Sequence, residues 1–178
     1  MEATADTEPT AEQIRDRIES AHPIIKRYTF WAMGFGIIPV PILDIAAVTG
    51  VQLKMMAALA EHYHQEFSHS WGKSILGSLV GGLGATGLAY GTFGALVKAI
   101  PGVGTLFGMV AMPVMAGATT YAVGKVFQMH FASGGTMLTF DVEKMRAYYE
   151  QHLRDGVRVA ASAPTRRSSS SGSETPVE

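Results

Sequence analysis

One stretch of the chain, residues 74–124, carries a single charge, Lys98, over 51 residues rich in Gly, Ala, Leu and Val. Lys98 divides it into uncharged runs of 24 residues (74–97) and 26 residues (99–124). As a helix, the first run would be about 36 Å long at about 1.5 Å per residue, whereas the hydrocarbon core of a bilayer is about 30 Å thick. The stretch therefore predicts a transmembrane helical hairpin, with its turn at Lys98, Pro101 and Gly102.

The glycines of the first run form a pattern of their own. Six of them follow one another at steps of three or four residues and share one face of a helix: Gly77, Gly81, Gly84, Gly87, Gly91 and Gly94. In a membrane, small residues at this spacing let a second helix approach closely. The nine Leu, Ile, Phe and Val residues of the run contribute only about −3 to −5 kcal/mol to insertion. Each helix alone is thus marginal, and we expect a packed pair that also self-associates.

Composition limits the classes of function. Charged residues make up 16% of the chain and the net charge is −1, so no basic field indicates a nucleic-acid partner. No cysteine is present, which excludes disulfides and thiolate chemistry. The acidic N-terminus is not a secretory signal peptide. Basic residues flank the hairpin on the side of both termini, and the positive-inside rule then predicts a bacterial inner-membrane protein with both termini cytoplasmic.

Amphipathic helices are predicted on both sides of the hairpin, within one helical domain at 10–160. Residues 1–9 are expected to be disordered, and Thr10 with Gln13 matches a capping box for a helix from about Ala11. Pro23 is expected to interrupt or kink this helix. The uncharged segment 28–43, with prolines at 39 and 41, is predicted to be re-entrant, interfacial or buried against the hairpin.

Two acids are placed to begin helices. Asp44 follows the proline-containing segment and is predicted to cap a second helix, the alternative being a proton or ion role at membrane depth. Asp141 is predicted to cap a last helix that stops at Gly156, after a turn at 133–136. The Ser-rich tail at 161–178 is expected to be disordered.

Metal-capable side chains occur in a polar, aromatic segment at 61–73. His62, Glu66 and His69 would share one face if the helix were continuous there. The alternative is an interfacial collar at the lipid head groups. Since no fourth ligand accompanies them, we assign no metal and keep these three as the candidates. Gly82, Gly84 and Gly87 match a dinucleotide fingerprint but follow no predicted strand, and no nucleophile with a base is found, so neither a cofactor nor catalysis is predicted.

Several motifs together resemble the YcjF-like family, the domain of unknown function numbered 697. The matching segments are 37–41 (IIPVP), 44–49 (DIAAVT), 52–55 (QLKM), 59–61 (LAE) with Tyr63, 98–105 (KAIPGVGT), 118–124 (ATTYAVG) with Phe127 and 130–131 (HF), and 133–136 (SGGT) with 140–141 (FD). The resemblance implies a bacterial membrane-associated domain, often fused to or encoded beside Era-like small GTPases and without an agreed activity. This chain has no GTPase domain of its own, so the resemblance implies a GTPase partner and supplies no catalytic residue.

Three classes of function follow. The first is a non-enzymatic, α-helical inner-membrane accessory or scaffold module that assembles through glycine-packed helices. The second is an oligomeric channel or transport element, in which Asp44 or the Lys98 turn contacts a solute. The third is a soluble helical bundle in which the glycine-rich helices are buried at the centre. We place the membrane module first.

Overall fold

The computed structural model describes residues 10–35, 41–89 and 107–162, with side chains described at 10–34, 46–81 and 112–162. These residues form five helices and no strand, which confirms the predicted all-α class. The helices are α1 (Ala11–Phe35), α2 (Pro41–His62), α3 (His69–Ala89), α5 (Phe107–Ala132) and α6 (Val142–Ala161). Residues 1–9 and 163–178, for which disorder is predicted, lie outside this description. The predicted start of the disordered tail is wrong by two residues, because Ala161 ends α6 and Ser162 caps it.

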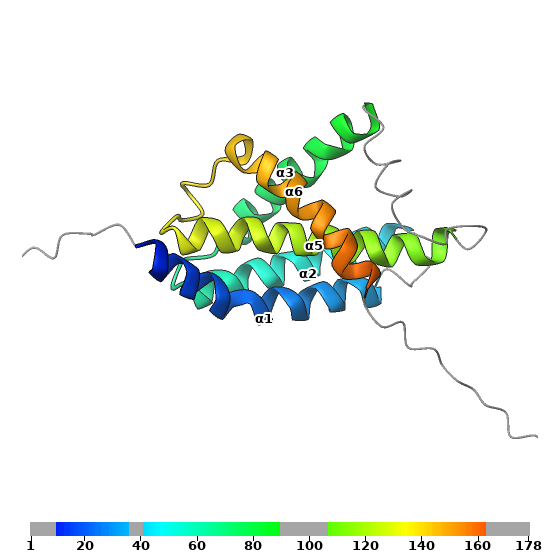
Figure 1. The fold of residues 1–178 in the computed structure, drawn as a ribbon. Helices are drawn as coiled ribbons and strands as arrows, with labels where there is room; N and C mark the ends of the chain where they lie inside the picture. The colour runs from blue at the N-terminus through cyan, green and yellow to red at the C-terminus, as the bar shows by residue number, and fades with distance from the viewer. Residues whose placement is uncertain (1–9, 36–40, 90–106, 163–178) are drawn as a thin grey trace, which may run out of the picture.

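Helix α5 lies at the centre of the bundle, packed most extensively against α6 and α1 and also against α2 (Figure 1). Between residues 113 and 128 nearly all of its side chains are buried. A helix that is apolar on all sides lies either in a protein core or in a membrane. Burial among three other helices therefore accounts for the apolar character of the described part of the second uncharged run.

The predicted hairpin is not confirmed. The described part of the first run, 74–89, lies in α3, which begins at His69. The described part of the second run, 107–124, lies in α5, which continues to Ala132, eight residues beyond the predicted end. Within the described ranges, no helix is long and apolar enough to span a bilayer. The predicted turn at Lys98, Pro101 and Gly102 lies outside the described residues.

Helix α1 begins as predicted. The Thr10 amide donates to Gln13 Oε1 (2.8 Å) and the Gln13 amide to Thr10 Oγ1 (3.4 Å), which is the reciprocal pattern of a capping box. The predicted interruption at Pro23 is wrong, because α1 continues through it to Phe35. Pro23 lies on the exposed side, whereas the buried side follows a helical spacing: Ala21, Ile25, Thr29 and Ala32.

A buried amide holds α2 against α5. The Gln52 side chain is 4% exposed, and its Nε2 donates to Thr119 Oγ1 and Thr120 Oγ1, each at 3.3 Å. Thr119 in turn donates to the Met115 carbonyl (2.9 Å). Because a buried polar group without a partner is costly, these bonds favour one register of α2 along α5.

The connection to α6 follows the predicted turn and cap. Gly134 has φ +84°, a left-handed conformation that suits glycine. Asp141 Oδ1 accepts from the amides of Glu143 (3.1 Å) and Lys144 (3.2 Å), so the predicted N-cap is confirmed. The predicted stop at Gly156 is wrong, because α6 continues to Ala161.

Candidate functional site

The three metal-candidate residues do not share a helix face. His62 ends α2, His69 begins α3, and Glu66 lies in the connecting loop, so the continuous helix that the prediction required is absent. The helix ends two residues before His64, whose φ is +56°. His62 Nε2 lies 2.9 Å from Ser20 Oγ on α1, and the His69 ring packs edge-on against Phe67 at 5.1 Å. In the described part of the chain, no group of three or more His, Asp or Glu side chains is arranged to hold a metal.

The predicted glycine face is open where it is described. Gly77 and Gly81 are exposed, and a Cβ added to either would meet nothing within 4 Å. Gly84 and Gly87 belong to α3, but their surroundings are not described, and Gly91 and Gly94 lie outside the described residues. Among the described residues, Gly77 and Gly81 therefore pack against no other helix, and their role in assembly stays a prediction.

Close helix contacts occur instead at glycines that the sequence analysis did not select. A Cβ at Gly124 would lie 2.8 Å from Ile25 Cγ2, and one at Gly156 would lie 2.7 Å from the Ala118 carbonyl oxygen. These contacts join α5 to α1 and α6. Each glycine approaches a residue of a different helix, so no single spacing pattern reveals them.

Asp44 lies within a helix rather than before it. Helix α2 begins at Pro41, four residues before the predicted first residue Ile45, so Asp44 is its fourth residue and does not occupy the N-cap position. Proline is well suited to a first helical position because its missing N–H has no intrahelical partner there. The Asp44 side chain is outside the described side chains, and an ion role for it stays a prediction.

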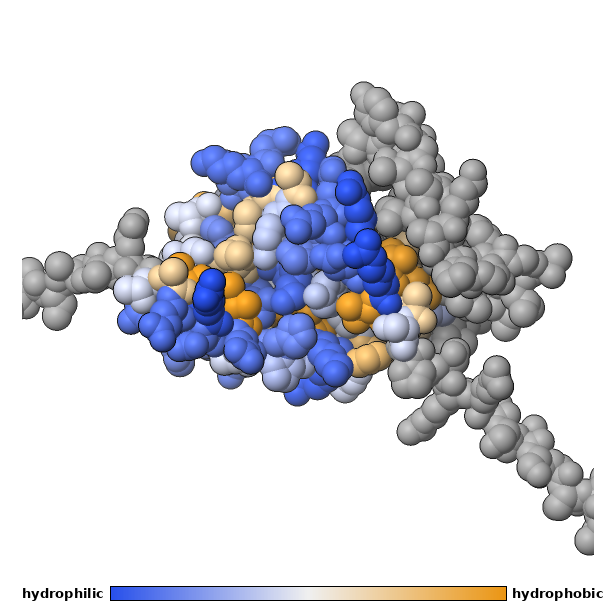
Figure 2. All heavy atoms as spheres, in the orientation of Figure 1, coloured by the Kyte–Doolittle hydropathy of each residue, from blue (hydrophilic) through white to orange (hydrophobic). Residues whose placement is uncertain are grey.

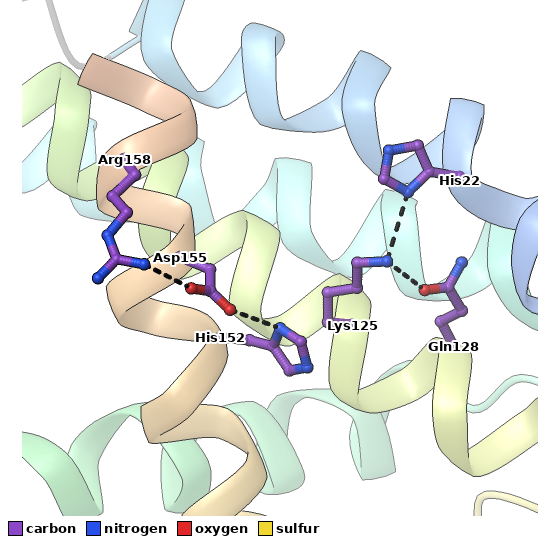
Figure 3. Close-up of polar contacts among 6 residues, drawn as sticks. All are labelled: His22, Lys125, Gln128, His152, Asp155 and Arg158. Carbon is purple, nitrogen blue, oxygen red and sulfur yellow. Dashed lines mark hydrogen bonds and ion pairs between the residues drawn. The ribbon is translucent and has the colours of Figure 1, made fainter. Parts of the chain in front are cut away.

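A group of polar side chains lies at the junction where α1, α5 and α6 meet. Figure 3 shows its members, His22 from α1, Lys125 and Gln128 from α5, and His152, Asp155 and Arg158 from α6. Lys125 Nζ lies 3.3 Å from His22 Nδ1 and donates to Gln128 Oε1 at 2.9 Å. The buried Gln128 side chain donates to the Ile18 carbonyl on α1.

The α6 half of the junction pairs an imidazole with a carboxylate. His152 Nδ1 lies 3.5 Å from Asp155 Oδ2, and Arg158 Nη1 lies 3.4 Å from Asp155 Oδ1. The His152 ring also packs edge-on against Tyr148 at 4.3 Å. Lys125 faces this half through Tyr121, whose ring centroid lies 5.8 Å from Lys125 Nζ and 6.4 Å from the His152 ring.

The electrostatics of the junction favour neutral imidazoles. Burial lowers the pKa of His22, and the charges of Lys125 and Lys26 lower it further, against a smaller raising effect of Glu19. Burial also lowers the pKa of His152, where Asp155 acts in the opposite direction and Lys125 in the same one. The pKa of Lys125 is lowered by burial as well. A protonated His22 could not accept from Lys125, and two cations would then face each other.

Acidification should therefore destabilise the fold. The pKa values of His22 and His152 are lower in the folded protein than the 6.5 of an unfolded chain. Above pH 6.5 both histidines are neutral in both states, and the fold keeps its full stability. As the pH falls below 6.5 towards the folded pKa, the unfolded chain binds protons first, and the free energy of unfolding decreases. We expect the free energy of unfolding, measured by urea titration, to fall between pH 7 and pH 5. In the double variant His22→Gln/His152→Gln, this fall should be clearly smaller. An equally steep fall in the double variant would show that other groups cause the acid sensitivity.

One part of this junction is indicated by residue spacing in the sequence. Lys125 and Gln128 are three residues apart on an apolar helix, a spacing that places them on one face. In the sequence, Lys125 is one of the basic residues that flank the predicted hairpin, and no pairing was predicted for it. His22 and His152 come from helices more than a hundred residues apart in the chain, and no local pattern joins them.

Comparison with known proteins gives two matches of interest. The family model described as "Domain of unknown function (DUF697)" matches residues 3–156. A magnetosome membrane protein 22 of Magnetospirillum gryphiswaldense is 42% identical over 160 residues, which cover 89% of this chain and 81% of that protein. No solved structure matches the chain.

Proposed function

This chain belongs to the family described as "Domain of unknown function (DUF697)". We propose that it is a non-enzymatic accessory protein of a membrane and that copies of it associate through their α3 helices. The name of the relative, a magnetosome membrane protein, supports attachment to a membrane. At the junction of α1, α5 and α6, Lys125 contacts His22 and Gln128, Gln128 donates to the α1 backbone, and His152 lies beside Asp155 without a hydrogen bond. A structural role accounts for them, and this supports assembly rather than catalysis.

The observation that carries the proposal is the contrast between the two sides of α3. One side packs against the bundle through residues at helical spacing: Gly72, Ile75, Leu76 and Leu79. The other side exposes Lys73, Ser74, Gly77, Ser78 and Gly81. In Figure 1, α3 leaves the bundle at an angle, so its later turns project away from the other helices.

A projecting helix with small residues on its open side is suited to pairing in a membrane. Lipid tails give apolar helices no hydrophobic reason to associate, so close backbone approach at small residues supplies the attraction. Since α5 is already covered by protein, we assign membrane attachment to α3 and to the uncharged sequence that follows it. Carbonate washing of membranes tests this attachment. The protein should remain in the pellet, and its release into the supernatant would contradict the proposal.

Substitution of Gly81 by leucine should abolish pairing without unfolding the monomer. A Cβ at Gly81 meets nothing within 4 Å of its own chain, and replacing glycine in a helix gains up to about 1 kcal/mol of helix propensity. A leucine would nevertheless hold a second α3 away. We expect chemical cross-linking in membranes to show loss of the dimer.

Ser78→Leu is the matched control. Ser78 is exposed on the same helix, but it lies about 100° around the axis from Gly77, about 120° from Gly84 and about 180° from Gly87, so it is off the centre of the glycine face. This variant should keep the cross-linked dimer. Loss of the dimer in both variants, or in neither, would contradict pairing through the glycine face.

The remaining features of the proposal rest on the sequence. We place the chain at a bacterial inner membrane with both termini in the cytoplasm, as the distribution of basic residues favours. The GTPase partner implied by the family stays a prediction, and we assign no residue to it.

A further inference from the structure

The exposed face of α1 changes in character along the helix. Its exposed acids lie in the first half, at Glu12, Asp16 and Glu19. Exposed basic residues follow at Lys26 and Arg27, and large apolar residues follow at Phe30 (40% exposed) and Trp31 (55% exposed). From Lys26 to Trp31 the rise along the axis is about 7.5 Å. Because Arg15 is also exposed among the acids, the face runs from mixed charge through basic to aromatic towards the C-terminal end of α1.

Neighbouring contacts tie the basic and aromatic groups together. The Arg27 guanidinium lies 5.1 Å from the centroid of the Tyr28 ring. The Tyr28 ring in turn lies 6.0 Å from the Trp31 ring. Arg27, Tyr28 and Trp31 therefore form one continuous surface, with the cation on the side away from the helix end.

Other helix ends lie at the same end of the bundle. A Cβ on Gly117 would lie 2.6 Å from Met33 Cγ and 3.3 Å from Ala160 Cβ, so the last turns of α1 and α6 meet the early part of α5 at one level. In Figure 1, α2 also begins at this end. Met112, five residues before Gly117 on α5, is 52% exposed. On the face drawn in Figure 2, one of the apolar areas lies at this right-hand edge.

The sequence that continues from this end is apolar. Residues 36–40, between α1 and α2, read Gly-Ile-Ile-Pro-Val. Residues 90–106, which lead into α5, carry Lys98 as their single charge. The opposite end of the bundle is more polar, because α6 begins there with Asp141, Glu143 and Lys144. The apolar end of the bundle is therefore joined in sequence to two apolar segments, 36–40 and 90–106.

We propose that this end of the bundle faces the bilayer, with Phe30 and Trp31 in the interfacial layer and Lys26 and Arg27 against anionic lipid phosphates. This placement rests on the proposed membrane function and gives it an orientation. The order of groups along α1 matches the order met on entering a membrane, in which basic residues bind the head-group phosphates and tryptophan lies at the boundary with the acyl chains. The acids of the first half of α1 then lie farthest from the negative surface.

The two tryptophans of the chain provide the test. Trp31 is in the last turns of α1, whereas Trp71 is in the first turn of α3 and is equally open, at 50% exposure. Trp71→Phe leaves Trp31 as the single reporter, and Trp31→Phe leaves Trp71. Each full-length variant is reconstituted into phosphatidylcholine–phosphatidylglycerol vesicles with and without brominated acyl chains. We expect brominated lipid to quench the fluorescence of Trp31 by about half, and that of Trp71 much less, because bromine quenches only at membrane depth.

Flotation of the same vesicles separates the two proposals. If neither variant floats with lipid, the membrane function itself is overturned. If both variants float but Trp31 is not quenched more strongly than Trp71, the membrane function stands and this orientation is overturned. Stronger quenching of Trp71 would instead favour the interfacial collar predicted at 61–73.

The basic residues are tested by a matched pair of double variants. Lys26→Gln/Arg27→Gln removes two exposed charges at the apolar end, and Arg15→Gln/Lys144→Gln removes two exposed charges elsewhere. Partitioning of protein from dilute detergent onto phosphatidylglycerol vesicles should fall by about 5- to 30-fold in the first variant and by much less in the second. An equal change in both variants, or none in the first, would overturn the head-group contact.

Discussion

Replacing Gly156 by leucine is expected to lower the free energy of unfolding by about 3 kcal/mol or more. For a domain of this size that corresponds to a fall in Tm of about 6–12 °C. The reason is that a Cβ at Gly156 would lie 2.7 Å from the carbonyl oxygen and 2.9 Å from the Cα of Ala118. These are backbone atoms of α5, so the clash is relieved only if α6 moves away from the central helix. Thermal unfolding followed by circular dichroism measures the effect.

Gly81→Leu is the control for this result, because it makes the same substitution on a helix where a Cβ meets nothing within 4 Å. It should leave Tm unchanged or slightly raised, since leucine has a higher helix propensity than glycine. Gly156→Ala should fall between the two, with a smaller clash and a gain in propensity. Equal Tm values for the Gly156 and Gly81 leucine variants would show that α5 and α6 do not approach as closely as described.

Local interactions were predicted correctly because they involve residues a few positions apart. The Thr10–Gln13 capping box and the Asp141 N-cap each satisfy backbone amides within one turn, and both are confirmed. The Asp44 cap was placed by the same argument, but α2 begins earlier, at Pro41. Gly156 was taken as a helix stop because glycine often ends helices. Its actual role, a close approach to Ala118, depends on a helix nearly forty residues away and leaves no local trace.

The uncharged stretch shows a limit of composition. A helix that is apolar on all sides has the same sequence signature in a protein core as in a lipid bilayer. The described part of the second run proved to be the central helix of the bundle, whereas α3 keeps Gly77 and Gly81 open. Spacing alone placed six glycines on one face but did not show which glycines contact another helix.

The candidate sites show the same limit of sequence patterns. His62, Glu66 and His69 have a spacing that is meaningful only on a continuous helix, and the loop between α2 and α3 removes that condition. The junction around Lys125 is assembled from α1, α5 and α6, so it becomes visible only once the three helices are packed. Sequence patterns therefore identified local structure, but not the sites that tertiary packing creates.

Phe127→Ala is the second change for which we expect a large loss, about 3–5 kcal/mol in the free energy of unfolding. Phe127 is 0% exposed, and its ring stacks on Phe140 with centroids 4.7 Å apart and an interplanar angle of 11°. It also packs against Phe131 at 5.6 Å. Phe140 directly precedes the Asp141 cap, so the loss of this stack also loosens the start of α6. Urea unfolding at neutral pH gives the size of the effect.

Phe30→Ala makes the same substitution at a position that is 40% exposed, and it should change the free energy of unfolding by no more than about 1 kcal/mol. In vesicle binding by the folded protein, the order of the two effects should be reversed, with the larger loss in Phe30→Ala. Loss of Phe30 removes an apolar side chain from the proposed interfacial layer and should weaken vesicle binding of the folded protein, whereas Phe127 is buried and contributes to binding only through the stability of the bundle. If Phe30→Ala destabilised the fold as strongly as Phe127→Ala, the end of α1 would be part of the core, and the bilayer would have no exposed aromatic surface there to contact.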